Sequence, residues 1–97
     1  MNKMVFISYN EAIEDEVLET LNTCVVKNYT KIPGVFGRGT TSGTHLGNDI
    51  WPGRNNLLLV VSDPQHVAQL VGSVKNLRKK LGKEGIKAFV LPVEEIT

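Results

Sequence analysis

Two arginines could bind an anion together, because they flank one glycine-rich stretch of the chain. Arg38 and Arg54 lie towards the two ends of residues 33–55. Guanidinium groups recognise phosphate and carboxylate oxygens through paired, charge-assisted hydrogen bonds. The alternative is that both arginines form surface ion pairs, which contribute little to stability. The pattern alone leaves both interpretations open.

A second pair of side chains could bind a metal ion. His45 lies in the same stretch, and Asp49 follows four positions later. Imidazole and carboxylate groups are ligands for divalent metals, and the remaining ligands would come from another subunit or from water. The alternative is a solvated loop histidine. Of the other candidates, His66 is expected to be an exposed helix residue and Cys24 a buried, unreactive thiol.

No motif in the sequence predicts an enzyme. A G-x-x-x-x-G-K-[ST] phosphate loop is missing, and the G-x-G of residues 37–39 does not continue into a dinucleotide-binding fingerprint. Neither G-x-S-x-G nor a pair of catalytic carboxylates appears. Cys24 as a nucleophile would need a partner base, which the sequence does not show. We therefore expect a protein that is not an enzyme.

The composition is typical of one globular domain spanning residues 1–97. Lys and Arg total 11 and Asp and Glu total 10, and this balance provides no positive field for nucleic-acid binding. A single cysteine excludes an intramolecular disulfide, which fits a reducing compartment. No apolar run approaches the ~20 residues needed to cross a bilayer. We expect a cytoplasmic protein that neither binds nucleic acid nor inserts into a membrane.

Hydrophobic periodicity predicts the element order βαββαβ. The expected strands are residues 4–9, 24–32, 56–62 and 86–93. Asn10 is a suitable N-cap for the first helix, and Asp63 followed by Pro64 begins the second. This order is that of the ferredoxin-like α+β sandwich, an antiparallel sheet with two helices on one face. Apolar residues occur on both faces of three strands, so we expect oligomerisation through the uncovered face.

Residues 33–55 are predicted to form a long, flexible loop between the second and third strands. They hold six of the nine glycines and show neither helical nor strand periodicity. Long loops inside compact domains are usually functional or disordered. This one carries Phe36 and Trp51, which a plain linker would not need. Trp51 would either pack against a neighbouring subunit or anchor a partner, since tryptophan is enriched in binding hot spots.

Two motifs resemble nitrogen regulatory proteins of the P-II family. Residues 87–96, Lys-Ala-Phe-Val-Leu-Pro-Val-Glu-Glu-Ile, resemble the last core strand of that family. Residues 34–39, Gly-Val-Phe-Gly-Arg-Gly, resemble the segment that opens its long T-loop. The resemblance implies a trimer that binds ATP or ADP, and 2-oxoglutarate, in clefts between subunits. It also implies a loop that docks on a target protein, such as a membrane transporter or an enzyme.

The same resemblance implies roles for individual residues. Glycine N–H groups at the base of the loop and a lysine on the last strand would together hold the anion. The expected ligand site consists of Gly37, Arg38, Gly39, Gly85 and Lys87. The expected partner contacts are Phe36, Trp51 and Arg54. We therefore expect a trimeric sensor of a small anion, with ATP, ADP and AMP as candidate ligands.

Departures from the family pattern fall where phosphates bind. The family's B-loop reads like Thr-Gly-x-x-Gly-Asp-Gly-Lys, whereas residues 81–87 lack its threonine and aspartate. The family's glutamine after Gly-Arg, which helps to hold magnesium and 2-oxoglutarate, is Gly39 here. The fold and the trimer are therefore implied more firmly than any particular nucleotide.

A second resemblance is to CutA, a family with the same fold and trimer that is linked to divalent-metal tolerance. It rests on residues 32–35, Ile-Pro-Gly-Val, on Trp51, and on the apolar strand at 57–61. The alternative expectation is therefore a CutA-like trimer that binds a divalent metal, with His45 and Asp49 as ligands.

Overall fold

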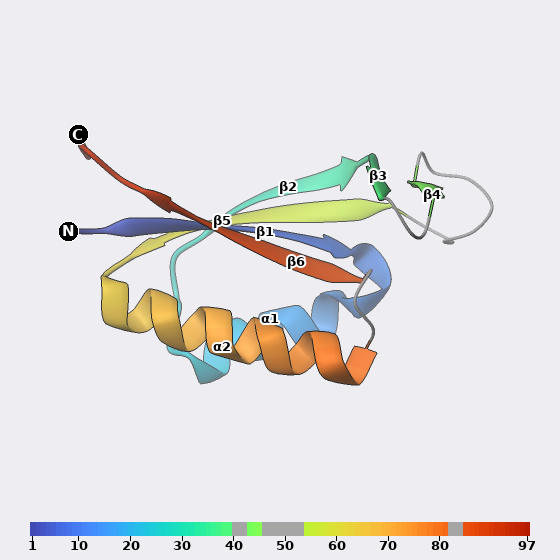
Figure 1. Cartoon of the computed structure of the whole chain (residues 1–97), viewed down its shortest axis with the longest axis horizontal. Helices are drawn as coiled ribbons and strands as arrows, with labels where there is room; N and C mark the ends of the chain where they lie inside the picture. Colours follow the sequence, from blue (N-terminus) through green and yellow to red (C-terminus); the bar gives the residue numbers. More distant parts are fainter. Residues whose placement is uncertain (40–42, 46–53, 82–84) are drawn as a thin grey trace.

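The computed structural model describes residues 1–39, 43–45, 54–81 and 85–97 (Figure 1). The main sheet consists of β1 (Lys3–Asn10), β2 (Thr30–Val35), β5 (Asn55–Ser62) and β6 (Ile86–Pro92). A 3-10 helix, η1 (Glu11–Ile13), leads into α1 (Glu14–Thr23), and α2 (Pro64–Leu81) follows β5. Two short strands, β3 (Gly37–Gly39) and β4 (Gly43–His45), pair with each other.

The main sheet is antiparallel, with the strand order β2-β5-β1-β6. Both helices pack on one face of it, below the sheet in Figure 1, and among the described residues no helix lies on the other face. The predicted ferredoxin-like α+β fold is thus confirmed. The chain termini lie at one end of the sheet, and β3 and β4 lie beyond the opposite end.

The core lies between the sheet and the two helices. Alternate residues of β1 and β5 face the helices, as the two-residue period of a strand requires. Their helical partners recur every three or four positions along α1 and α2. The buried apolar residues of these four elements are Val5, Ile7, Tyr9, Val17, Leu21, Leu58, Val60, Val67, Leu70 and Val74.

Both predicted helix starts are confirmed by side-chain hydrogen bonds. The Asn10 Oδ1 atom accepts from the N–H of Ala12 at 2.9 Å, so Asn10 caps η1 rather than α1 directly. The Asp63 Oδ1 atom accepts from the N–H of His66 at 2.9 Å, and Pro64 occupies the first helical position. His66 is exposed and its ring contacts the same Asp63 carboxylate. In the described part of the chain, neither helix is long and apolar enough to cross a membrane.

The prediction of a strand at residues 24–32 was wrong for the first half of that range, because α1 ends there in a hydrogen-bonded turn. The N–H of Val25 donates to the carbonyl of Asn22, and the N–H of Val26 donates to that of Leu21. These two bonds form a Schellman motif, which places Val25 at the position usually occupied by glycine. Val25 accordingly has a φ of 59°. The apolar run that looked like a strand is therefore a helix terminus, and β2 begins only at Thr30.

The loop predicted for residues 33–55 is shorter than expected. Strand β2 continues through Pro33 to Val35, with a shift in register between Ile32 and Val35. Proline is tolerated here because β2 is an edge strand of the sheet that the described residues form. The glycine-rich residues 37–39 also pair with 43–45 as β3 and β4. This pairing was not predicted, because glycine repeats carry no strand periodicity.

The sheet face away from the helices is apolar, as predicted. The registers align Phe6 with Leu59 on one side and with Phe89 on the other. The rings of Phe6 and Phe89 meet edge to face, with centroids 6.3 Å apart. Phe89 remains 50% exposed in the single chain. We call this surface the open face; its other apolar members are Met4, Ile32, Leu57, Val61 and Leu91.

The strained conformation of Val25 leads to a stability prediction. A left-handed conformation costs an L-residue roughly 1–2 kcal/mol, whereas glycine adopts it freely. Val25 is 65% exposed, so its side chain contributes little burial. The entropy that glycine adds to the unfolded chain offsets part of this relief. Val25→Gly should therefore raise the free energy of unfolding by about 0.5–1 kcal/mol. Urea denaturation at fixed protein concentration would measure this as a higher midpoint with an unchanged slope.

The neighbouring residue provides the control. Val26 packs against the core, so Val26→Gly should destabilise the protein. A lower urea midpoint for Val25→Gly would contradict the assignment of strain to Val25.

Candidate functional site

The starts of β5 and β6 lie on either side of the end of β1. The N–H of Asn10 donates to the carbonyl of Gly85 at 2.9 Å, and the N–H of Glu11 donates to the carbonyl of Arg54 at 2.8 Å. Arg54 and Gly85, which are 31 positions apart in the sequence, are therefore at the same end of the sheet. Two strand spacings separate them, a distance of about 10 Å.

Arg54 contacts Phe36, so two of the three predicted partner-binding residues lie together. The guanidinium carbon of Arg54 is 5.6 Å from the centroid of the Phe36 ring, which is a cation–π arrangement. Gly37 approaches the return side as well, because a Cβ built on it would lie 3.6 Å from Nδ2 of Asn55. We call this junction the loop neck: Gly34, Phe36 and Gly37 on the outgoing side, Arg54 and Asn55 on the return side.

The remaining predicted ligand residues on the outgoing side are in β3. The backbone of Gly37 pairs with His45, that of Arg38 with Thr44, and that of Gly39 with Gly43. Strand β3, which consists of Gly37, Arg38 and Gly39, thus begins two residues after the end of the edge strand β2.

Lys87 lies at the opposite edge of the sheet. It is the second residue of β6, it is exposed, and its Nζ is 6.0 Å from the Phe89 ring centroid on the open face. The registers place Lys87 beside Ser8, Ser8 beside Leu57, and Leu57 beside Ile32. Three strand spacings, about 14 Å, therefore separate Lys87 from β2. Lys87 and β2, the strand that leads to Arg38, are therefore at opposite edges of the main sheet.

Only part of the predicted metal site lies in the described residues. His45 is in β4, and Asp49 and Trp51 lie outside the described residues. Within the part of the chain that the structure describes, no three His, Cys, Asp or Glu side chains are placed to hold a metal ion.

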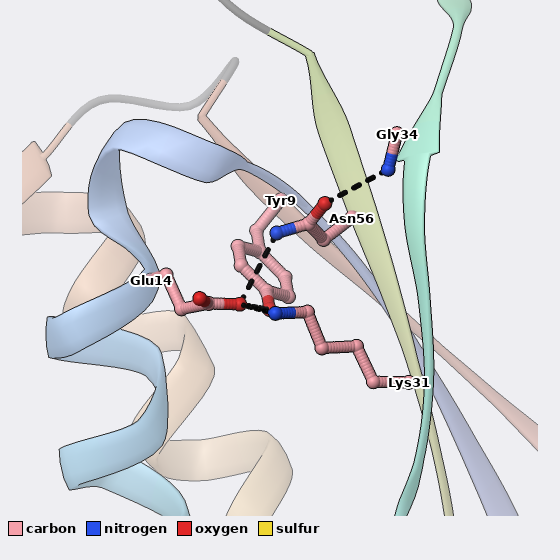
Figure 2. A network of polar contacts seen from close by, with 5 residues as sticks. All are labelled: Tyr9, Glu14, Lys31, Gly34 and Asn56. Atoms are coloured by element: carbon pink, nitrogen blue, oxygen red, sulfur yellow. Dashed lines mark hydrogen bonds and ion pairs between the residues drawn. The ribbon is translucent and has the colours of Figure 1, made fainter.

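A polar network that the sequence analysis missed lies beneath the loop neck (Figure 2). One carboxylate oxygen, Oε1 of Glu14, accepts from the Tyr9 hydroxyl at 2.7 Å and from Nδ2 of Asn56 at 3.1 Å. The same oxygen is 2.6 Å from Nζ of Lys31. Asn56 in turn accepts from the N–H of Gly34 at 3.1 Å. The network thus connects α1 with β1, β2 and β5.

The network shifts the ionisation of two of its members in opposite directions. The hydrogen bonds from Lys31 and then Tyr9 lower the pKa of Glu14, because they favour the charged carboxylate. Burial, together with the hydrogen bond to Glu14, raises the pKa of Tyr9, because both disfavour a phenolate. Near neutral pH, Glu14 is therefore an acceptor and Tyr9 a donor, as their geometry requires.

Little in the sequence pointed to this network. Asn56 and Tyr9 occupy strand positions that period-two alternation assigns to the core, and both carry polar atoms that need partners once buried. That requirement was the available signal. The network also needs Glu14 and Lys31, and their positions follow from the strand register and the helix packing.

The comparison with solved structures found proteins of the same fold. CPII from Thiomonas intermedia K12, bound to ADP and bicarbonate, has a TM-score of 0.74 and 18% identity, over 92% of this chain and 82% of that one. A PII-like signalling protein from Thermus thermophilus has a TM-score of 0.65 and 19% identity over the same shares. A DUF3240 family protein from Shewanella baltica has a TM-score of 0.69 and 11% identity, over 99% and 93%. At these identities the likeness establishes the fold.

The comparison of sequences adds the family. Among curated proteins, none matched the chain. The family model described as "Nitrogen regulatory protein P-II" matches residues 1–97. This match agrees with the resemblance found in residues 34–39 and 87–96 and with the observed element order. The chain belongs to the P-II family of nitrogen regulatory proteins.

Proposed function

We propose that this protein is a homotrimeric P-II-type sensor, not an enzyme, that binds a small anion in clefts between its subunits. The candidate ligand is an adenine nucleotide, with bicarbonate as a second anion. The ligand-dependent state of the segment between β2 and β5 would then control contact with a partner protein. In this account residues 1–97 act as a single P-II-like domain in the cytoplasm.

The observation that carries the proposal is the separation of the expected ligand residues. Gly37, Arg38 and Gly39 follow the β2 edge of the sheet, whereas Lys87 lies on β6 at the other edge. A head-to-tail ring of chains would bring the β2 edge of one subunit towards the β6 edge of the next. Each cleft would then combine glycine N–H groups and Arg38 from one chain with Lys87 from its neighbour. Both positive charges and backbone donors favour an anion there.

The open face supports a ring of this kind. It carries apolar side chains from all four strands of the main sheet, and a large exposed apolar patch usually marks an interface. Closing three chains around a common axis would cover the open face of each one.

The nucleotide is favoured by the relatives. The Thiomonas protein is described in complexes with ADP and bicarbonate, and with ADP, AMP and bicarbonate. That this chain binds the same ligands is an inference from the shared family and fold. The missing threonine and aspartate before Lys87 make AMP and ADP better first choices than a ligand that needs a complete B-loop.

The partner would meet the loop neck and the segment beyond it. Phe36 and Arg54 contact each other, so they would present an aromatic ring and a guanidinium as one surface. Trp51 would add a second aromatic group to that surface. A membrane transporter or an enzyme is the class of target that the family resemblance implies.

The ligand proposal predicts that Lys87→Ala weakens nucleotide binding. The side chain is exposed, so the variant should fold, and the loss of one charge-assisted hydrogen bond should lower ADP affinity roughly 10- to 100-fold. Isothermal titration with ADP, AMP and bicarbonate would measure the change. Lys79→Ala removes the same charge from an exposed position on α2 and should leave affinity unaltered.

Equal ADP affinity in Lys87→Ala and the unmodified protein would remove Lys87 from the site. Stabilisation by divalent metals, with none by ADP, AMP or bicarbonate, would overturn the anion site and favour the CutA-like alternative.

The trimer proposal predicts that a charge on the open face separates the subunits. Phe89→Glu places a carboxylate beside Phe6, where a neighbouring chain would have to desolvate it. Light scattering should give three times the chain mass for the unmodified protein and a smaller mass for Phe89→Glu. Leu81→Glu, an equal change at an exposed apolar position on α2, should remain trimeric. A monomer at micromolar concentration before any substitution would contradict the proposal.

A further inference from the structure

Asn56 is a buried polar residue next to apolar core residues of the same strand. It lies on the helix-facing side of β5, in line with the buried Leu58 and Val60, and only 4% of it is exposed. A buried amide is costly unless its donor and acceptor are both used. Nδ2 of Asn56 donates to Oε1 of Glu14, and Oδ1 accepts from the N–H of Gly34. The side chain therefore bridges α1 and β2.

The bond to Gly34 replaces a missing ladder bond. The β2–β5 register shifts between Ile32 and Val35, so the regular pairing is interrupted at Gly34. Gly34 has a φ of 67°, a conformation that favours glycine. A Cβ built on Gly34 would lie 3.6 Å from Nη1 of Arg54, so a bend here also brings the chain against the return side of the loop neck. The Asn56 side chain thus holds the bend from which Phe36 and Gly37 leave the sheet.

Glu14 holds Asn56 in that orientation. Its Oε1 atom is the acceptor for Asn56 and also for Tyr9, and it forms an ion pair with Lys31 of β2 (Figure 2). An amide that rotated to present its other end to Glu14 would oppose oxygen to oxygen. The carboxylate therefore selects the rotamer in which Oδ1 points at Gly34. Among the described residues, Glu14 is connected to Gly34 through Asn56, and it also contacts Lys31 of β2.

We propose that Glu14 and Asn56 form a positioning unit that sets the direction in which the loop neck leaves the sheet. The first turn of α1 thereby controls the bend at Gly34 and, through it, the placement of Phe36 against Arg54. In ligand binding, a consequence that rests on the proposed function, Glu14 and Asn56 are positioning residues that do not touch the ligand.

The test uses Glu14→Ala, because Glu14 makes no direct contact with Gly34. Hydrogen exchange of ¹⁵N-labelled full chains, followed by NMR, would compare the Gly34 amide with those of Val5 and Ile7 in the central strand β1. Glu14→Ala should accelerate exchange at Gly34 about fivefold or more, the effect of weakening one buried hydrogen bond, and leave Val5 and Ile7 within twofold. Glu16→Ala, an exposed acid of the same helix, should change none of the three.

Asn56→Leu is the second variant and removes the bridge itself. It should accelerate hydrogen exchange of the Gly34 amide at least as much as Glu14→Ala does. Adding Glu14→Ala to it should not change the exchange rate of Gly34 further. Asn76→Leu on α2 is the matched control. If Gly34 keeps its protection in Glu14→Ala, or if Val5 and Ile7 accelerate in parallel with it, Glu14 has only a general structural role and the inference is overturned.

Titration with ADP separates this inference from the proposed function. Glu14→Ala should weaken ADP binding several-fold although Lys87 and Arg38 are intact, and Glu16→Ala should not. Should the unmodified protein bind neither ADP nor AMP, the proposed function fails, and the exchange rate at Gly34 still decides whether the positioning unit exists.

Discussion

The arrangement of this molecule follows from a sheet whose helices, in the described part of the chain, all lie on one side. Two helices are enough to cover one face of four strands, and the alternation of each strand then leaves a second set of side chains without cover. In this chain that second set is largely apolar. A chain of 97 residues buries only about two-thirds of its unfolded surface, so covering the open face with further copies would add substantially to its stability. The proposed oligomer and the proposed sites between subunits both follow from this one constraint.

The same sheet separates the residues expected to bind the anion. Strand order puts β2 and β6 at opposite edges, and the chemistry is divided between them. Glycine N–H groups and Arg38 are on one side, and Lys87 is on the other. In a ring, each cleft is complete only when two chains meet, so ligand binding and assembly become linked. In the proposed ring, the polar contacts beneath the loop neck would give the cleft a defined wall on the β2 side, because Asn56 bonds both Gly34 and Glu14.

The sequence predicted the architecture well because local signals agreed with one another. Asn10 and Asp63 are N-caps, and the stripes that follow them are the core faces of the helices. Prediction was wrong where a long-range or backbone effect prevailed over local propensity. Val25 looks like a strand residue, yet the helix end takes its N–H. Pro33 looks like a strand terminator, yet an edge strand tolerates it.

The site was predicted only as far as single residues allow. The family motifs located Arg38 and Lys87 in the sequence, but the distance between them depends on strand order, which no motif encodes. Phe36 and Arg54 were expected to act on a partner, and their contact with each other became visible only in the folded chain. The Glu14–Asn56 bridge joins residues 42 positions apart. These two residues become neighbours only when α1 packs against the sheet.

The central claim is that each anion site is shared by two chains, and mixed assemblies test it most directly. Chains carrying Arg38→Ala and chains carrying Lys87→Ala would be co-expressed with different affinity tags, and the mixed oligomers isolated through both. Neither variant alone should bind ADP with full affinity. Mixed trimers should regain unmodified sites at about a third of their clefts, where an intact Arg38 meets an intact Lys87 from the neighbouring chain. Mixed oligomers that bind ADP no better than the separate variants would show that the site is not divided between subunits.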